Sequence, residues 1–165
     1  MTFEVGDHVV YPSQGEGVVQ ERTTREALGE THEYLKVVSV KGDMEVLVPL
    51  RRGSDVGLRH TIGADEVDRL FDALVKGNLN LPLQWPPRYR AEQEILARGA
   101  AYDLARLIGV LARRDIEKGL AATEREVLDT AKSMLGSELA IVTGTDLAGA
   151  LARLDAVVAE RVSPD

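Results

Sequence analysis

The segment from Asn80 to Arg90, with the sequence NLPLQWPPRYR, constrains the fold more than any other part of the chain. It contains the only tryptophan, Trp85, and three of the six prolines. Because proline fixes φ and has no amide hydrogen, the run from Pro82 to Pro87 can neither continue a strand nor lie inside a helix. The sequence before it is mostly strand-like, and the sequence after it is helical. We therefore predict a junction between two kinds of structure, with an aromatic side chain in it.

Residues 1–50 predict about four or five short strands. β-Branched residues are concentrated in residues 18–24 and 34–40, which is typical of strands. Turn-forming residues lie between these runs at Leu28–Glu30 and after them at Lys41–Asp43. Short strands joined by tight turns indicate a small twisted barrel of the SH3 or Tudor type.

Apolar residues recur with helical spacing in the remainder of the chain. The expected helices are 65–76, 88–97, 101–117, 123–142 and 146–161. Gly77 suits the C-cap of the first helix, Thr123 with Glu126 fits a capping box, and Thr145 or Asp146 can cap the last helix. Each apolar stripe is about one helix face wide, so the helices are expected to pack against each other. The predicted fold class is therefore α+β, a small barrel followed by a compact all-α domain.

The residues around Trp85 allow two interpretations. Pro87 suits the first position of a helix, so Trp85 would lie just outside its N-terminus, with Arg88 and Arg90 in the first turn. Arginines at this end oppose the helix dipole, at a cost of a few tenths of a kcal/mol. Either an anion docks there, or Trp85 packs onto the domain junction and the arginines are solvated.

The net charge of −7 argues against a strong nonspecific nucleic-acid binder. The charge is nevertheless uneven, because basic residues outnumber acidic ones between residues 85 and 119. The basic residues there are Arg88, Arg90, Arg98, Arg106, Arg113, Arg114 and Lys118, and the acidic ones are Glu92, Glu94, Asp103, Asp115 and Glu117. On the helix 101–117, the pairs Arg106/Arg113 and Arg114/Lys118 have the spacing of residues that share a face. This face is either a basic patch or an ordinary solvated surface.

No catalytic arrangement is found in the sequence. The chain has no cysteine, so it lacks disulfides, thiolate metal sites and cysteine nucleophiles. Glu92/Glu94 and Glu124/Glu126 are two positions apart, so the members of each pair do not face each other on a helix. We expect no enzyme activity, no cofactor and no metal. The absence of a signal pattern and of a membrane-length apolar run predicts a cytoplasmic protein without a membrane partner.

Several short motifs together resemble the CarD/CdnL family of bacterial regulators that bind RNA polymerase, and the match covers nearly the whole chain. These motifs are Val5–Pro12 (VGDHVVYP), Gly15–Gly17, Glu33–Leu35, Val48–Pro49, Trp85 with Arg88–Arg90, and Arg113–Leu120 (RRDIEKGL). The N-terminal part is also similar to the polymerase-binding domain of transcription-repair coupling factors. The tryptophan segment and the helical tail favour CarD/CdnL.

The resemblance implies a division of labour. Residues 1–64 would form a Tudor-like domain that binds the β-subunit lobe of RNA polymerase. Residues 65–165 would form a helical DNA-binding domain, with a linker helix at 65–76, a tryptophan loop at 77–87 and helices over 88–161. Trp85 would wedge into the minor groove at the upstream edge of the transcription bubble and so stabilise the open promoter complex. Through its binding to polymerase, the protein would be associated with the nucleoid.

The resemblance also assigns residues. The expected polymerase contacts are Arg25, Glu45, Val46, Leu47, Val48 and Pro49. The resemblance puts Trp85 in the wedge role, with Arg88 and Arg90 beside it as phosphate contacts. The basic patch described above adds Arg106, Arg113, Arg114 and Lys118 to the expected DNA contacts. Leu47 departs from the family pattern, in which this position is often basic. We expect the protein to be a monomer. Two alternative functions remain open: an adaptor on polymerase without DNA contact, and a small hydrolase, for which the sequence has no motif.

Overall fold

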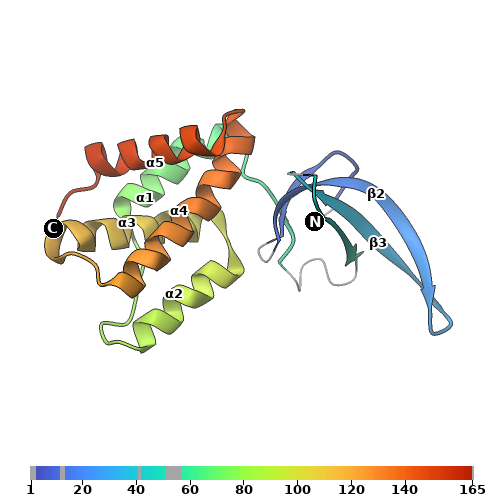
Figure 1. Cartoon of the computed structure of the whole chain (residues 1–165), viewed down its shortest axis with the longest axis horizontal. Helices are drawn as coiled ribbons and strands as arrows, with labels where there is room; N and C mark the ends of the chain where they lie inside the picture. The colour runs from blue at the N-terminus through green and yellow to red at the C-terminus, as the bar shows by residue number, and fades with distance from the viewer. Residues whose placement is uncertain (1–2, 12–13, 41, 51–56, 165) are drawn as a thin grey trace. The chain divides into compact units, whose positions relative to one another are not determined.

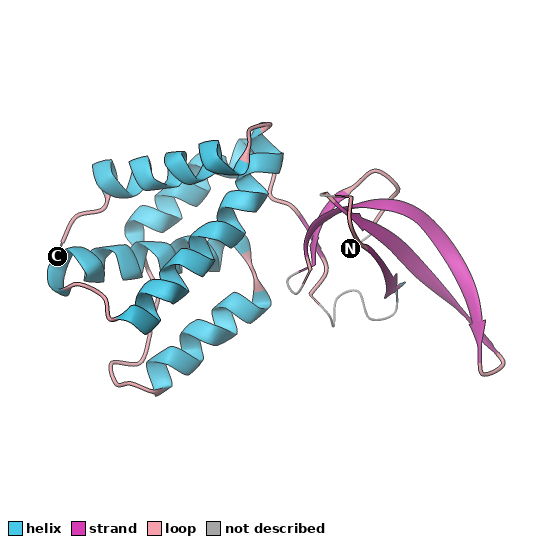
Figure 2. Ribbon diagram, viewed as in Figure 1, coloured by secondary structure: helices cyan, strands magenta, loops and turns pink. Residues whose placement is uncertain are grey.

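The computed structural model describes residues 3–11, 14–40, 42–50 and 57–164 of the 165-residue chain. The chain divides into two compact units, residues 1–61 and 62–165. The first, called the strand unit, contains all the strands of the described residues, and the second, called the helical unit, contains the α-helices (Figures 1 and 2). The mixed architecture predicted from the sequence is therefore confirmed.

The strand unit is a five-stranded antiparallel sheet with the order β4-β3-β2-β1-β5. The strands are β1 (His8–Tyr11), β2 (Gly15–Ala27), β3 (Glu30–Ser39), β4 (Glu45–Pro49) and β5 (Arg59–His60). The described strands form an open sheet, so a closed barrel is not shown and stays a prediction. Pro12 and Lys41, which belong to a predicted motif and a predicted turn, lie outside the described residues.

The β2–β3 hairpin is the longest feature of the sheet, and its tip lies where the sequence predicts it. Leu28 and Gly29 occupy the two turn positions with φ of 54° and 80°. Positive φ at both central positions is the geometry of a two-residue turn whose twist matches that of the strands. The register shifts between Val19 and Glu21, which marks a β-bulge in β2.

One face of the sheet forms a small apolar core. Val9, Val19, Leu35, Val37 and Val48 are buried on it. Successive side chains of a strand point to opposite faces, so the residues between these positions lie on the other face. This alternation decides which predicted polymerase contacts are accessible.

The helical unit begins with a short 3-10 helix, η2 (Ala64–Glu66). Five α-helices follow: α1 (Val67–Lys76), α2 (Pro87–Arg98), α3 (Ala101–Lys118), α4 (Ala122–Thr143) and α5 (Leu147–Arg161). They surround a leucine-rich core to which α1, α3, α4 and α5 all contribute. Gly109 allows α3 to approach α1 closely, because a Cβ there would overlap the carbonyl oxygen of Leu74.

The helix ends test the predicted caps. Gly77 ends α1 in the left-handed conformation, with φ of 53°. Asp146 caps α5, because its side chain accepts a hydrogen bond from the Gly149 amide at 2.7 Å. Both of these predicted caps are confirmed. The predicted capping box of Thr123 and Glu126 is wrong. The N-cap of α4 is Ala121, two positions before Thr123, and it has no capping side chain.

A buried carboxylate fixes the start of the helical unit. Glu138 on α4 is 1% exposed, and one of its oxygens accepts a hydrogen bond from the Ile62 amide at 2.8 Å. A buried charge of this kind needs partners of its own. The contact therefore ties the first residue of the helical unit to the C-terminal part of α4.

Candidate functional sites

Trp85 lies at the N-terminal end of α2, immediately before the two prolines that open the helix. Its side chain is 44% exposed. One side of the indole packs on Tyr89, with ring centroids 5.0 Å apart, and the guanidinium carbon of Arg88 lies 5.3 Å from the indole centroid. Pro87 is the first residue of α2, as predicted, and the Trp85–Pro86 peptide bond is cis. Trp85 is thus supported by its own helix while part of its surface faces solvent.

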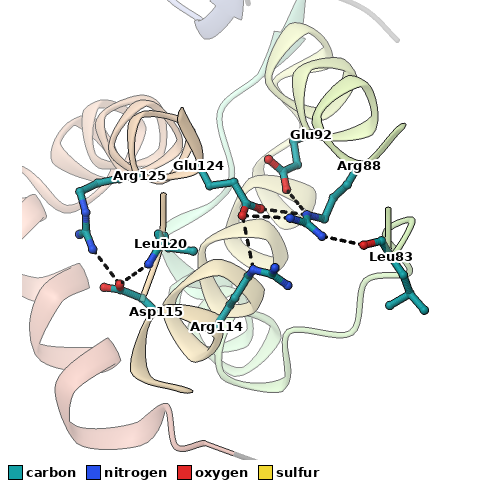
Figure 3. Close-up of polar contacts among 8 residues, drawn as sticks. All are labelled: Leu83, Arg88, Glu92, Arg114, Asp115, Leu120, Glu124 and Arg125. Atoms are coloured by element: carbon teal, nitrogen blue, oxygen red, sulfur yellow. Dashed lines mark hydrogen bonds and ion pairs between the residues drawn. The ribbon is translucent and has the colours of Figure 1, made fainter. Parts of the chain in front are cut away.

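Arg88 connects the tryptophan loop to α4 (Figure 3). Its Nε and Nη2 donate to the two carboxylate oxygens of Glu124 at 3.0 and 3.1 Å. Its Nη1 donates to the carbonyl oxygen of Leu83 at 2.9 Å. The side chains of Arg88 and Glu124 are only 11% and 5% exposed. A two-point ion pair of this kind has a defined geometry, so Arg88 fixes the loop relative to α4.

A second carboxyl group lies against the same guanidinium. Glu92 is completely buried, and one of its oxygens lies 3.7 Å from Arg88 Nε, while neither oxygen has a hydrogen-bond partner in the described residues. Burial, reinforced by the neighbouring Glu124 carboxylate, raises the pKa of Glu92 from 4.5 to about 8, although Arg88 and Arg114 oppose the shift. Glu92 is therefore mostly protonated at neutral pH.

Arg114 on α3 completes this group, which we call the arginine–glutamate cluster: Arg88, Glu92, Arg114 and Glu124. The Nε of Arg114 lies 3.4 Å from a Glu124 oxygen. Three elements therefore meet at one carboxylate, namely α2, α3 and α4. The cluster explains why an arginine is stable in the first turn of α2, because the anion that it requires is supplied by Glu124 of the same chain.

Two hollows flank the cluster. One, of about 380 Å³, is lined by Trp85, Arg88, Arg114 and the residues at the start of α4. The other, of about 270 Å³, is lined by the loop residues Leu79, Leu81, Pro82 and Leu83 together with basic residues of α3. Trp85, Arg88 and Arg114, which the sequence predicts as DNA contacts, thus come together around a single concave surface.

The remaining predicted DNA contacts differ in how far they are engaged within the protein. Arg90 and Lys118 are exposed, and neither has a side-chain partner within the described part of the chain. Arg113 donates to the carbonyl oxygens of Val75 and Ser163. Arg106 pairs with Asp103 at 3.0 Å and lines neither hollow. Among the predicted DNA contacts, Arg90 and Lys118 are therefore the cations least engaged within the protein.

In the strand unit, the sheet register places most of the predicted polymerase contacts on one face. His32 pairs with Arg25, and Lys36 pairs with Leu47. His32 and Lys36 are four positions apart on β3, so they and their cross-strand partners share a face. Glu45 and Pro49 lie two positions from Leu47 on β4 and share this face as well. Arg25, Glu45, Leu47 and Pro49 therefore form one surface, which we call the outer face.

Val46 and Val48 point to the opposite side. Val48 is 1% exposed and belongs to the core of the strand unit, and Val46 packs against this core. Their side chains are therefore largely committed to the protein interior. β4 is an edge strand of the described sheet, so these two valines offer a partner mainly the backbone groups of that edge.

The sequence analysis missed Glu92 and Glu124 as members of one site. It compared each only with a carboxylate two positions away on the same helix. Their actual relationship is between α2 and α4, and no local pattern reports it. The one available signal was the arginine in the first turn of α2, which requires an anion.

No group of three or more histidines, aspartates or glutamates in the described residues is arranged to hold a metal ion. Among the helices of the described chain, none has both the length and the hydropathy that a membrane span requires.

Comparison with known proteins agrees with this two-unit organisation. Residues 3–61 match the domain family described as the CarD-like/TRCF RID domain, and residues 69–155 match the CarD C-terminal domain. The "Putative transcription factor YdeB" of Bacillus subtilis (strain 168) is 27% identical over 142 residues, which cover 86% of this chain and 93% of YdeB. The chain belongs to the CarD family, as its motifs predict. Its RID domain implies an interaction with RNA polymerase.

Proposed function

We propose that this protein stabilises the open promoter complex of RNA polymerase by inserting Trp85 into the minor groove at the upstream edge of the transcription bubble. The observation that carries the proposal is the state of Trp85, which is half exposed yet held by Tyr89 and Arg88. A tryptophan that served only as packing would be expected to bury more of its surface, since a large apolar side chain gains stability by burial.

Insertion at a base step explains why the wedge would favour melted DNA. Unstacking a step costs a few kcal/mol in intact duplex. The cost is smaller where the strands have already begun to separate. The wedge therefore binds the open complex more tightly than the closed complex, and only such a difference in affinity shifts the equilibrium between them. Sequence preference should be weak, because the minor groove carries a degenerate code.

Tethering to polymerase compensates for weak affinity for free DNA. The chain has a net charge of −7, and Arg88, Arg106 and Arg113 of the predicted DNA contacts are engaged within the protein. A negative chain with so small a set of disengaged cations near Trp85 should bind free DNA weakly. We infer that the strand unit holds the β-subunit lobe through its outer face and the edge of β4, which raises the effective concentration of Trp85 at the promoter.

The decisive experiment measures the lifetime of the open complex with purified polymerase and the Trp85→Ala variant. We expect binding to polymerase to be retained and the lifetime to fall by about tenfold, since loss of an inserted apolar group removes on the order of 1–2 kcal/mol of differential affinity. Trp85→Phe should keep an intermediate lifetime because it retains an aromatic wedge.

An unchanged open-complex lifetime for Trp85→Ala, with polymerase still bound, would exclude the wedge. The remaining function would be that of a polymerase adaptor that does not contact DNA. Tryptophan fluorescence gives an independent readout, because Trp85 is the only tryptophan. Insertion predicts that fork-junction DNA, added at high concentration to the isolated protein, quenches its emission. An adaptor predicts an emission that the DNA does not change.

A further inference from the structure

Leu83 has more of its surface exposed than any other large apolar residue described in the helical unit. It is 93% exposed, whereas Trp85 is 44% exposed. The two leucines before it in the loop, Leu79 and Leu81, are partly buried and pack against the helical core. The loop therefore turns its last leucine outward, two positions before Trp85.

The backbone of Leu83 is held in place. Its carbonyl oxygen accepts a hydrogen bond from Arg88 Nη1 at 2.9 Å, and the next carbonyl oxygen, that of Gln84, accepts one from the Arg88 amide at 3.0 Å. In Figure 3 the Leu83 carbonyl group points at the guanidinium of Arg88 and its side chain points away from the arginine–glutamate cluster. The same arginine thus positions both exposed apolar side chains of the loop.

We propose that Leu83 is a second apolar contact to promoter DNA, packing on the deoxyribose edge of the minor groove beside the step that Trp85 enters. This inference rests on the function proposed above. Leucine is among the side chains that minor-groove proteins insert into DNA. Two residues of chain span at most about 7 Å, and successive phosphates of a strand are about 3.4 Å apart along the helix axis. Leu83 therefore falls within about two steps of Trp85.

The surroundings favour DNA over a protein partner for this surface. Isolated exposed leucines are common and need no explanation, but Leu83 is next to a half-exposed indole on a fixed backbone. Arg90, one helical turn beyond Pro87, is exposed and has no side-chain partner in the described chain. An apolar pair beside an unpaired cation suits a groove whose sugars are apolar and whose rims carry phosphates.

The experiment compares open-complex lifetimes for Leu83→Ala, Leu83→Met, Trp85→Ala and the double variant Leu83→Ala/Trp85→Ala on the full chain. Leu83→Ala should shorten the lifetime by roughly threefold, because a few methyl groups of apolar contact are lost. Leu83→Met should restore most of it. In the Trp85→Ala background the Leu83 change should have little further effect, since Leu83 reaches the groove only when the indole is inserted.

Leu147→Ala is the matched control, because Leu147 is an exposed leucine at the start of α5, and α5 lies on the opposite side of the helical unit from α2 (Figure 1). It should leave the lifetime unchanged.

A normal lifetime for Leu83→Ala beside a shortened one for Trp85→Ala would overturn the inference about Leu83 and leave the proposed function standing. Normal lifetimes for both would overturn the proposed function too. A shortened lifetime that follows equally weakened polymerase binding would place Leu83 outside the DNA contact and overturn the inference.

Discussion

Arg88 and Glu124 face each other across α2 and α4 and share two hydrogen bonds of 3.0 and 3.1 Å. Both side chains are almost fully buried. Charges removed from water need such paired, directional contacts, because an uncompensated buried charge is strongly destabilising. The same guanidinium also binds the Leu83 carbonyl oxygen and lies over Trp85. The pair therefore links the stability of the helical unit to the position of the residue that we propose enters DNA.

The first prediction concerns Glu124→Gln. Removing the charge leaves Arg88 and Arg114 without their shared carboxylate, and breaking a buried pair in this way costs about 3–5 kcal/mol. We expect the free energy of unfolding to fall by about 3 kcal/mol, the lower end of this range, because Glu92 can ionise more readily once its acidic neighbour is neutral. Urea denaturation measures the change.

Glu126→Gln is the control for Glu124→Gln. Glu126 is exposed on the same helix two positions further on, and surface changes of this kind are usually within about 0.5 kcal/mol. Equal stabilities for the two variants would mean that the Arg88–Glu124 pair contributes nothing to the fold.

The second prediction separates two arginines that the sequence analysis treats alike. Arg88→Gln should lower the free energy of unfolding by several kcal/mol, because it leaves a buried carboxylate without its partner. Arg90→Gln should leave stability unchanged and weaken DNA binding. Loss of one phosphate contact should make DNA binding by Arg90→Gln less sensitive to salt. The slope of log K against log salt concentration should become shallower by about 0.9.

Unfolding curves and DNA titrations at several salt concentrations provide both readouts for this pair. A stable Arg88→Gln variant with the reduced salt slope would instead place Arg88 at a phosphate, as the family resemblance implies. The comparison thus decides between an internal and an external partner for this guanidinium.

The contrast between these two arginines shows how far the sequence could go. Helical periodicity and turn chemistry are local, so the helices, the β2–β3 turn and the Gly77 and Asp146 caps could be predicted from neighbouring residues. The contact between Arg88 and Glu124 joins residues 36 positions apart. Nothing in either local sequence indicates which carboxylate will reach the arginine, because that depends on how α2 packs against α4.

The same reasoning explains the capping box that the sequence predicted incorrectly. Thr123 and Glu126 have the right spacing, but Ala122 already belongs to α4. This places Glu124 in the first turn of the helix, where its side chain turns inward to Arg88. The spacing of Thr123 and Glu126 does not report this tertiary contact, which lies at the observed start of α4.

The third prediction is a pH dependence of stability that arises from Glu92. The folded protein holds the proton of Glu92 up to about pH 8, whereas the unfolded chain releases it near the usual value of 4.5. Between these values the folded state binds more protons than the unfolded state, so stability falls as the pH rises. The expected slope approaches 1.4 kcal/mol per pH unit for one proton.

Glu92→Gln tests this assignment, because it removes the ionisable group and keeps the shape of the side chain. The free energy of unfolding of the variant should be nearly constant between pH 6 and pH 8, while that of the natural sequence declines. Asp7 and Glu66 have lowered pKa values, so the stability they contribute is lost at acidic pH and does not overlap this window. A parallel decline in the variant would assign the dependence to another group.

The fourth prediction concerns the outer face of the strand unit. Arg25 lies on this face with Leu47, and Arg22, three positions earlier on β2, lies on the opposite face because strand side chains alternate. Both arginines are exposed, so Arg25→Glu and Arg22→Glu make the same change of charge on the two faces of one strand.

If polymerase binds the outer face, Arg25→Glu should weaken binding by about tenfold or more, since reversing an interface charge costs at least about 1.4 kcal/mol. Arg22→Glu should retain affinity, and both variants should keep the unfolding curve of the natural sequence. A binding assay with the isolated β-subunit lobe measures the difference, and equal losses in the two variants would show that net charge, rather than the outer face, governs the interaction.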